Sequence, residues 1–177
     1  MTRIVCVLIA LLLAACASLT ASMPRVRALD AVLLDLLTAG YRSSPTIRGL
    51  VDRLERSDVI VHLERLTRPS GGVGGTLRFV GRAGGFRYVR IAVDTTRWPH
   101  ALAMLGHELQ HALEVAADPT AVDEASFEAL YRRIGQECRR RVRARFDTKA
   151  AQAVTQQVLD ELSDTPRRRV RAGGTLR

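Results

Sequence analysis

The spacing of apolar residues changes near residue 95, and this change constrains the fold of the chain more than any other sequence feature. Over residues 86–94 apolar side chains alternate with others in steps of two, which is typical of a strand with one buried face. From about residue 97 to residue 117 they recur at intervals of three and four, the spacing of an amphipathic helix. A strand region that leads directly into a long helix predicts an α+β domain.

Three segments ahead of that helix have the composition and alternation of strands, at residues 59–66, 76–81 and 86–94. Gly-rich spacers at residues 71–75 and 83–85 separate them and suit hairpin turns that need positive φ. We therefore expect a small three-stranded antiparallel sheet packed on the long helix.

Two helices are expected before the sheet. The first carries an apolar stripe from Leu29 to Leu37 and has Gly40 as its stop signal. The second opens at Ser44-Pro45, because Pro is favoured in a first helical turn. Its stripe consists of four apolar residues: Ile47, Leu50, Val51 and Leu54.

The long helix and two later helices follow the sheet. Thr95 or Thr96 can cap the long helix, and Asp118-Pro119 ends it. Further helices are expected at residues 124–134, with a buried face that includes Leu130 and Tyr131, and at residues 147–162.

The N-terminus has the parts of a secretory signal: a positive charge at Arg3, an apolar stretch at residues 4–13, and small residues after it. About ten apolar residues are too few to span roughly 30 Å of hydrocarbon, so a permanent transmembrane helix is not expected. The end of the segment, Leu13-Ala14-Ala15-Cys16, resembles the bacterial lipoprotein signal. The resemblance implies that the Cys16 thiol is acylated and that the chain is cut just before it. Cleavage near residues 20–22, which would release a soluble exported protein, is the alternative.

This interpretation divides the chain into a lipoprotein signal peptide (1–15), a linker (16–27), a single folded domain (28–164) and a basic disordered tail (165–177). We expect a membrane-anchored lipoprotein of the cell envelope or, in the alternative, a secreted or periplasmic protein. Loss of the signal also removes Cys6 and leaves Cys138 as the only thiol of the domain, so no internal disulfide is expected.

The formal net charge of +9 does not by itself indicate a polyanionic partner. It comes from 27 Lys+Arg against 18 Asp+Glu, and Lys149 is the only lysine, a pattern that a genome rich in Arg codons produces. The Arg-rich run at residues 139–145 contains no aromatic residue for base stacking, so we expect no nucleic-acid partner. A solvated charged turn is the default interpretation of the run, and attraction to an anionic membrane surface is the functional one.

The chemistry of the chain is concentrated inside the long helix, in the segment His107-Glu108-Leu109-Gln110-His111. Histidines four residues apart lie one turn apart on the same helix face, so both imidazoles can reach one ion. Neutral imidazole nitrogen suits Zn²⁺, and Glu108 would project beside the ion, where it can take a proton from the water that zinc activates. The motif therefore predicts a zinc site in which Glu108 acts as the general base.

The motif and its neighbours, Gly106-His107-Glu108-Leu109-Gln110-His111-Ala112, resemble the active-site helix of the zincin metallopeptidases. The order of elements over residues 57–162 is also similar to theirs, although the likeness is specific only at the motif. The resemblance implies a zincin-like fold, His107 and His111 as zinc ligands, Glu108 as general base, and a peptide or protein substrate that pairs with an edge strand.

Two histidines leave a zinc ion under-ligated, so a third protein ligand is expected. The residues after His111 lack the Gly and third His of the metzincins, which leaves a gluzincin-type carboxylate from a later element. The candidates are Asp147, Glu128 and Glu124. Asp147 is preferred, because it shares the apolar stripe of the last helix, although it also suits a plain N-cap.

The two remaining histidines are not expected to bind this ion. His100 lies seven residues before His107, about 10 Å along the helix axis, and is expected to face solvent. His62 is expected on the surface face of a strand.

The sequence thus predicts a zinc-dependent peptidase on a membrane-anchored lipoprotein. The alternatives are a metal-binding or envelope-binding lipoprotein that keeps the scaffold without catalysis, and a structural helical lipoprotein without metal.

Overall fold

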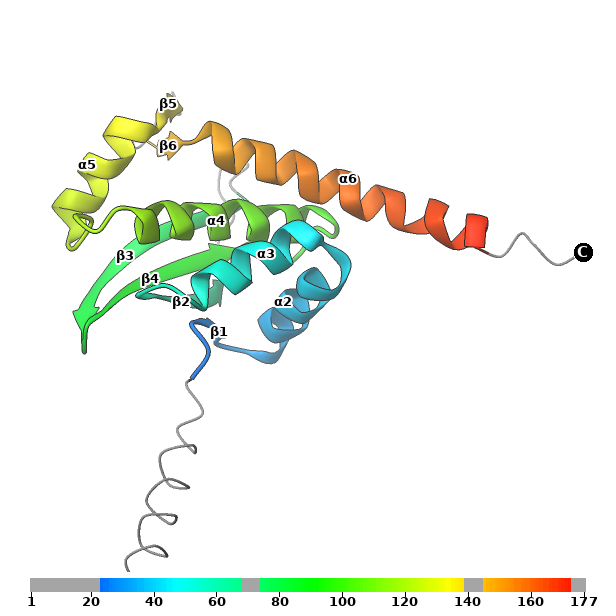
Figure 1. The fold of residues 1–177 in the computed structure, drawn as a ribbon, viewed down its shortest axis with the longest axis horizontal. Helices are drawn as coiled ribbons and strands as arrows, with labels where there is room; N and C mark the ends of the chain where they lie inside the picture. Colours follow the sequence, from blue (N-terminus) through cyan, green and yellow to red (C-terminus); the bar gives the residue numbers. More distant parts are fainter. Residues whose placement is uncertain (1–22, 68–73, 139–144, 173–177) are drawn as a thin grey trace, which may run out of the picture.

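The computed structural model describes residues 23–67, 74–138 and 145–172 (Figure 1). The elements in chain order are β1 (Val26–Ala28), α2 (Ala31–Ser43), α3 (Pro45–Leu54), β2 (Val59–Arg65), β3 (Gly75–Ala83), β4 (Phe86–Val93), α4 (His100–Ala117), α5 (Glu124–Ile134), β5 (Gln136–Cys138), β6 (Arg145–Asp147) and α6 (Lys149–Ala172). The signal peptide with Cys16 and most of the Arg-rich run lie outside the described residues. Within them, no helix combines the length and the apolar character needed to cross a membrane.

The main sheet is mixed, with strand order β1-β2-β4-β3, and a separate two-stranded ribbon pairs β5 with β6. β2 is parallel to both β1 and β4, and only the edge strand β3 runs antiparallel to its neighbour. The α+β class is confirmed, but the prediction of three antiparallel strands is wrong. The reason lies in β2, where Val59, Ile60 and Val61 are all buried. Such a continuous apolar run is typical of a central strand with partners on both sides, not of the outer strand of a hairpin.

The strand β1 was not predicted and lies at the end of the expected linker. Three residues are too short to show a periodic pattern, so their strand conformation depends on tertiary partners. The main chain of β1 pairs with β2, and the Arg25 and Val26 amides donate hydrogen bonds to the Glu55 carboxylate at 2.9–3.2 Å.

The hairpin between β3 and β4 is confirmed. Gly84 and Gly85 connect the strands with φ of 56° and 81°, the two positive values that a type I′ turn requires. By contrast, no hairpin joins β2 to β3, since β4 lies between them in the sheet.

The hydrophobic core lies between one face of the sheet and the helices. Leu102, Leu105 and Leu109 of α4 are fully buried, as are Val89 and Ile91 of β4. The helices gather on one side of the sheet, with α6 lying along α4 (Figure 1). This places α4 between the sheet and α6, which is the arrangement that encloses the candidate site.

The boundaries of α3 and α5 agree with the prediction from local signals. Ser44 accepts a hydrogen bond from the Ile47 amide at 3.0 Å, and Pro45 occupies the first turn. Helix α5 spans the predicted residues and begins with a capping box between Asp123 and Ser126.

Helix α2 differs from the prediction in its buried face and its end. Leu29 and Val32 of the expected stripe are 58% and 48% exposed, and the buried positions are Leu33, Leu36 and Gly40. Gly40 does not end the helix. A Cβ there would lie 3.0 Å from side-chain atoms of Ile47 and Leu102, so glycine allows the helices to approach closely.

Two helix starts also differ from the predicted caps. Thr96 does not cap α4, because its amide and hydroxyl both donate to the Asp94 carboxylate, and the helix begins at His100. Asp147 is not part of α6. Thr148 accepts from the Ala151 amide at 3.1 Å and caps that helix instead. Helix α6 then continues to Ala172, into the segment predicted as a disordered tail, where arginines have good helix propensity.

The C-terminal end of α4 is held by a buried arginine on β4. The Arg87 guanidinium donates to the carbonyls of Val115 at 2.7 Å and Asp118 at 2.6 Å, and it pairs with the Asp58 carboxylate at 2.7–2.8 Å. Helix ends leave carbonyls without partners and carry partial negative charge, so a cation there is doubly favourable. Arg87 thereby fixes the helix that carries the histidines to the sheet.

Candidate metal centre

The structure brings His107, His111 and Asp147 together. The two histidines lie on consecutive turns of α4, with their Nε2 atoms 3.2 Å apart. Asp147, the last residue of β6, places Oδ1 3.4 Å from Nε2 of His107 and 4.0 Å from Nε2 of His111. One ligand atom from each residue falls within 4.8 Å of the others, so the group has the dimensions of a metal site.

The tautomer of His107 is set by α6. Its Nδ1 lies 2.9 Å from the Thr155 hydroxyl, which itself donates to the Ala151 carbonyl at 3.1 Å. Because the hydroxyl proton is used toward Ala151, the hydroxyl oxygen accepts from Nδ1–H of His107. The proton therefore sits on Nδ1, and the lone pair of Nε2 points toward His111 and Asp147.

The tautomer of His111 is set by Glu114, one turn further along α4. Glu114 Oε2 accepts from His111 Nδ1 at 2.8 Å, while Oε1 accepts from the Thr148 hydroxyl at 2.6 Å. A carboxylate cannot donate, so Nδ1 carries the proton and Nε2 keeps its lone pair. The Tyr131 hydroxyl donates to the main-chain carbonyl of His111 at 3.0 Å and supports the same turn.

Two imidazole lone pairs that face each other at 3.2 Å repel unless a cation lies between them. Asp147 Oδ1 adds a third acceptor, which is buried and has no hydrogen-bond donor among the described residues. A tetrahedral zinc ion with bonds of about 2.0–2.1 Å holds its ligand atoms about 3.3–3.4 Å apart. The observed separations of 3.2 and 3.4 Å fit that geometry, and 4.0 Å needs only a small closure.

The protonation equilibria of the two rings differ. Burial lowers the pKa of His107, and the neighbouring His111 lowers it further, against the carboxylates of Asp147 and Glu114. Burial also opposes charging of His111, but the hydrogen bond to Glu114 and the charges of Glu108, Glu114 and Asp147 outweigh it, so that its pKa is raised. The carboxylates around His111 therefore favour a cation at this ring, whether a proton or a metal ion.

Glu108 lies beside this group and against the edge strand. Its side chain is 4% exposed. A Cβ placed on Gly75, the first residue of β3, would come within 2.6 Å of its Oε1 atom. The absence of a side chain at Gly75 therefore leaves the space that the Glu108 carboxylate occupies.

Sequence reasoning missed the residues that orient the histidines. Glu114 follows His111 by three residues and so shares its helix face, a spacing from which it could have been found. Thr155 and Thr148 belong to the start of α6, and nothing in the sequence indicates that these turns lie against α4. Tyr131 was predicted as buried, which is confirmed, but not as a partner of the His111 main chain.

The other candidate ligands lie away from the histidines. Glu124 and Glu128 are exposed on α5, and Glu128 pairs with Arg132 at 2.9 Å. His100 is exposed at the start of α4. His62 lies on β2, 6.1 Å from the ring of Tyr88. The prediction that these two histidines do not join the site agrees with their positions.

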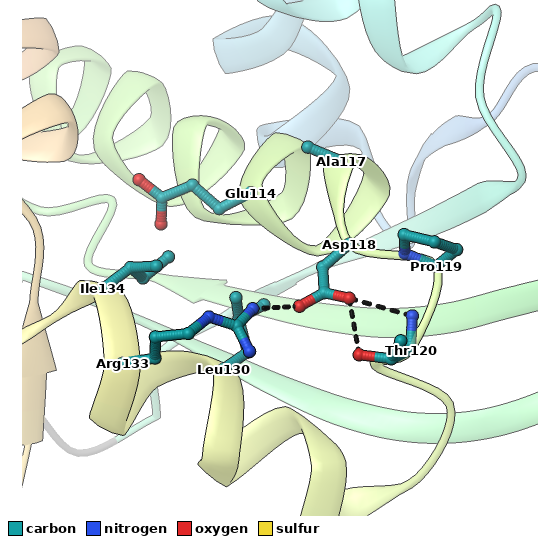
Figure 2. A pocket seen from close by; sticks show the side chains of 8 residues that line it. All are labelled: Glu114, Ala117, Asp118, Pro119, Thr120, Leu130, Arg133 and Ile134. Atoms are coloured by element: carbon teal, nitrogen blue, oxygen red, sulfur yellow. Dashed lines mark hydrogen bonds and ion pairs between the residues drawn. The ribbon is translucent and has the colours of Figure 1, made fainter.

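A pocket of about 460 Å³ opens on the outer side of Glu114, between the end of α4 and α5. Figure 2 shows Glu114 above the Arg133–Asp118 ion pair, Ile134 next to Arg133, and Thr120 also bound to Asp118. The pocket does not include His107, His111 or Asp147, so it borders the site through Glu114 alone.

Comparison with known proteins adds no relative: no protein-family model matches the chain, and no curated protein or solved structure matches it.

Proposed function

We propose that the protein is a zinc-dependent peptidase, held at the cell envelope by a lipid on Cys16. One observation carries the proposal: the Nε2 lone pairs of His107 and His111 face each other at 3.2 Å. Beside them lies Asp147 Oδ1, which receives no hydrogen bond among the described residues. Such a set of acceptors suits a divalent cation with nitrogen and oxygen preference, and zinc is the commonest ion in sites of this type.

His107, His111 and Asp147 would hold the ion. Zinc bound by them would supply a Lewis acid that lowers the pKa of water to about 7. The Glu108 carboxylate would accept the proton of the attacking water and later deliver it to the leaving amine. Thr155 and Glu114 hold the two imidazoles with Nε2 toward the site, so that neither ring must rotate or change its tautomer before binding.

The edge strand β3 supports a peptide as the substrate. Among the described residues it pairs with β4 on one side only, so its other main-chain edge has no strand partner. An extended peptide can bind such an edge through main-chain hydrogen bonds. Gly75, at the start of this strand, lies against Glu108, which would bring a peptide bound there to the general base.

Metal analysis and one substitution test the proposal together. Protein purified without added zinc should contain close to one equivalent of zinc per chain and hydrolyse peptides. Glu108→Gln should retain the zinc and lose roughly two or more decades of turnover. The control is Glu128→Gln, which changes an exposed glutamate of α5 and should leave both zinc and turnover unchanged. Absence of zinc from the wild-type protein would contradict the proposal outright.

A metal-binding protein without catalysis is the second candidate, and the burial of the site favours it. The side chains of His107 and His111 are only 12% and 7% exposed, and the neighbouring pocket does not reach them. In that case Glu108→Gln would change neither zinc content nor any rate, and the wild-type protein would hydrolyse no peptide.

The lipid anchor has its own test. Cells that express the protein and are fed labelled palmitate should incorporate the label, and Cys16→Ser should abolish the incorporation. Cys6→Ser is the matched control, because the implied cleavage removes that residue.

A further inference from the structure

A row of three arginines and one histidine crosses the sheet on the face turned away from the core. Residues directly opposite one another in the four strands are Arg27 of β1, His62 of β2, Arg90 of β4 and Arg78 of β3. Neighbouring strands lie about 4.8 Å apart, so the row extends for roughly 14 Å.

These side chains share the outer face because they alternate with the core residues of the same strands. Val61 and Val89 precede His62 and Arg90 and are fully buried in the core. Figure 1 shows the helices on the other side of the sheet, and the Arg78 side chain is 69% exposed. No described helix lies over the row.

The charge of this face is poorly compensated. Arg78 and Arg90 lie directly opposite each other, a like-charged pair that destabilises a sheet. Both share one acid, Glu64, at 3.6 Å, which is beyond hydrogen-bond distance. The Nε atom of Arg90 is buried without a hydrogen-bond acceptor among the described residues, as is that of Arg25.

The pKa of His62 responds to the positive charge of this face. Burial lowers its pKa, and the charges of Arg27 and Arg90 on either side lower it further. The histidine thus remains neutral between two arginines, and Tyr88 packs against it at 6.1 Å. The face combines fixed positive charges with aromatic rings, which suits an interface where headgroups and acyl chains meet.

We propose that this outer sheet face, centred on Arg27, Arg78 and Arg90, docks the domain on an anionic lipid membrane. The short distance along the chain between Cys16 and β1 agrees with a membrane as the partner. Cys16 precedes Val26 by ten residues, so the start of β1, which contributes Arg27, lies at most about 36 Å of extended chain from the anchor. The inference rests on the proposed envelope location but not on zinc or catalysis.

This docking also orients the candidate metal centre. Helix α4 packs on the core face of the sheet, and His107 and His111 point from it toward α6 and β6. With the outer face on lipid, the centre lies on the side of the domain that is turned away from the membrane.

Vesicle binding of the full chain tests the proposal. The readout is a ratio of two partition coefficients: that onto phosphatidylcholine vesicles with about a third phosphatidylglycerol, divided by that onto pure phosphatidylcholine vesicles. The ratio is used because the apolar residues 4–13 contribute to binding of both kinds of vesicle. The wild-type protein should prefer the anionic vesicles, and the preference should fall as salt is raised. In the variant Arg27→Gln/Arg78→Gln/Arg90→Gln the ratio should drop at least tenfold, since one arginine near such a surface contributes about fivefold.

The matched control removes the same charge from the helical side of the domain, as Arg42→Gln/Arg53→Gln/Arg56→Gln, three exposed residues of α2, α3 and the turn after it. This variant should keep most of the preference, and circular dichroism should show both variants folded. Equal losses in the two variants, or no preference for anionic vesicles in the wild type, would overturn the proposal. Displacement of the protein from the vesicles by single-stranded oligonucleotide at equal phosphate would overturn it too, in favour of a nucleic-acid surface.

The outcome can be separated from that of the proposed function. The outer-face variant should bind zinc and hydrolyse a soluble peptide as the wild type does, because none of the three arginines contacts the candidate metal centre. A protein without zinc that still shows the vesicle preference would contradict only the peptidase.

Discussion

Nε2 of His107 lies 3.2 Å from Nε2 of His111, and the Nδ1 atom of each ring is occupied by a different partner. The acceptors are Thr155 from α6 and Glu114 from α4, so two neutral rings direct only lone pairs at each other, and a proton or a metal ion is needed between the Nε2 atoms. The arrangement costs free energy in the absence of a cation, and it is preorganised for one.

The first prediction concerns Asp147. Asp147→Ala should lower zinc affinity about as much as His107→Ala or His111→Ala, because each removes one of three protein ligands. Isothermal titration of metal-free protein with zinc measures the effect. Glu124→Ala and Glu128→Ala serve as controls and should bind zinc normally, since both residues are exposed on α5. Wild-type affinity in Asp147→Ala would remove it from the ligand set.

The second prediction concerns the carboxylate behind His111. In Glu114→Gln only the amide oxygen can accept a hydrogen bond from His111 Nδ1. When the amide nitrogen faces Nδ1 instead, it donates and favours the tautomer with the proton on Nε2. Zinc affinity should fall roughly 10–100-fold, the range typical of lost partners of metal-binding histidines. Thermal unfolding with added zinc gives a second readout, since zinc at a hundred times its Kd stabilises the folded state by about 2.7 kcal/mol. Unchanged affinity would mean that Glu114 does not orient the ring.

The third prediction concerns the contact between α4 and α6. A Cβ on Gly106 would lie 3.1 Å from Val158 and 3.2 Å from Val154, so Gly106→Ala should displace these side chains of α6 by a few tenths of an ångström and loosen the Thr155 contact with His107. The steric cost should cancel the gain of about 1 kcal/mol in helix propensity and weaken zinc binding. Gly49→Ala is the control, because nothing lies within 4 Å of its added methyl group and it should stabilise the protein by up to about 1 kcal/mol.

Adding Val158→Ala to Gly106→Ala should restore zinc affinity by making room for the methyl group. If Gly106→Ala alone stabilised the protein as much as Gly49→Ala and kept full affinity, the close approach of α6 would be irrelevant to the site.

The fourth prediction concerns pH. Hydrogen bonds from Arg87 lower the pKa of Asp58, partly against burial, so the folded state binds that proton less readily than the unfolded chain. The contribution of Asp58 to stability is therefore complete above its unfolded pKa, about 3.9, and is lost as the pH falls through the folded value. Asp58→Asn should be less stable than the wild type at pH 6, and the difference should shrink below about pH 4. Urea unfolding at several pH values measures it, and a difference that stays constant would contradict the assignment.

Much of the helical structure could be predicted from the sequence because its signals are local. Ser44-Pro45 begins α3, Asp118-Pro119 ends α4, and the motif histidines share a face through helix geometry alone. These features depend on residues within one or two turns, so the rest of the chain cannot alter them much.

The order of the strands could not be predicted in the same way. A hairpin was expected wherever glycines separate two strands, and it forms at Gly84-Gly85, but β4 lies between β2 and β3. Pairing of distant strands depends on which faces can be buried together, a property of the assembled layers and not of any one segment.

The position of Asp147 depends both on local sequence and on tertiary structure. Its carboxylate was expected near the histidines from a stripe on the last helix, yet it ends β6, outside α6, and approaches them from there. Whether it binds metal stays a prediction.

The sequence by itself determined that His107 and His111 share one helix face, because covalent spacing and helical pitch are sufficient for that. Only the tertiary structure decided which groups accept from their Nδ1 atoms and which carboxylate stands third. It also aligned Arg27, His62, Arg90 and Arg78 across the sheet. These relations join residues that are far apart in the chain, so they exist only once burial of the apolar faces has brought α4, α6 and the strands into contact.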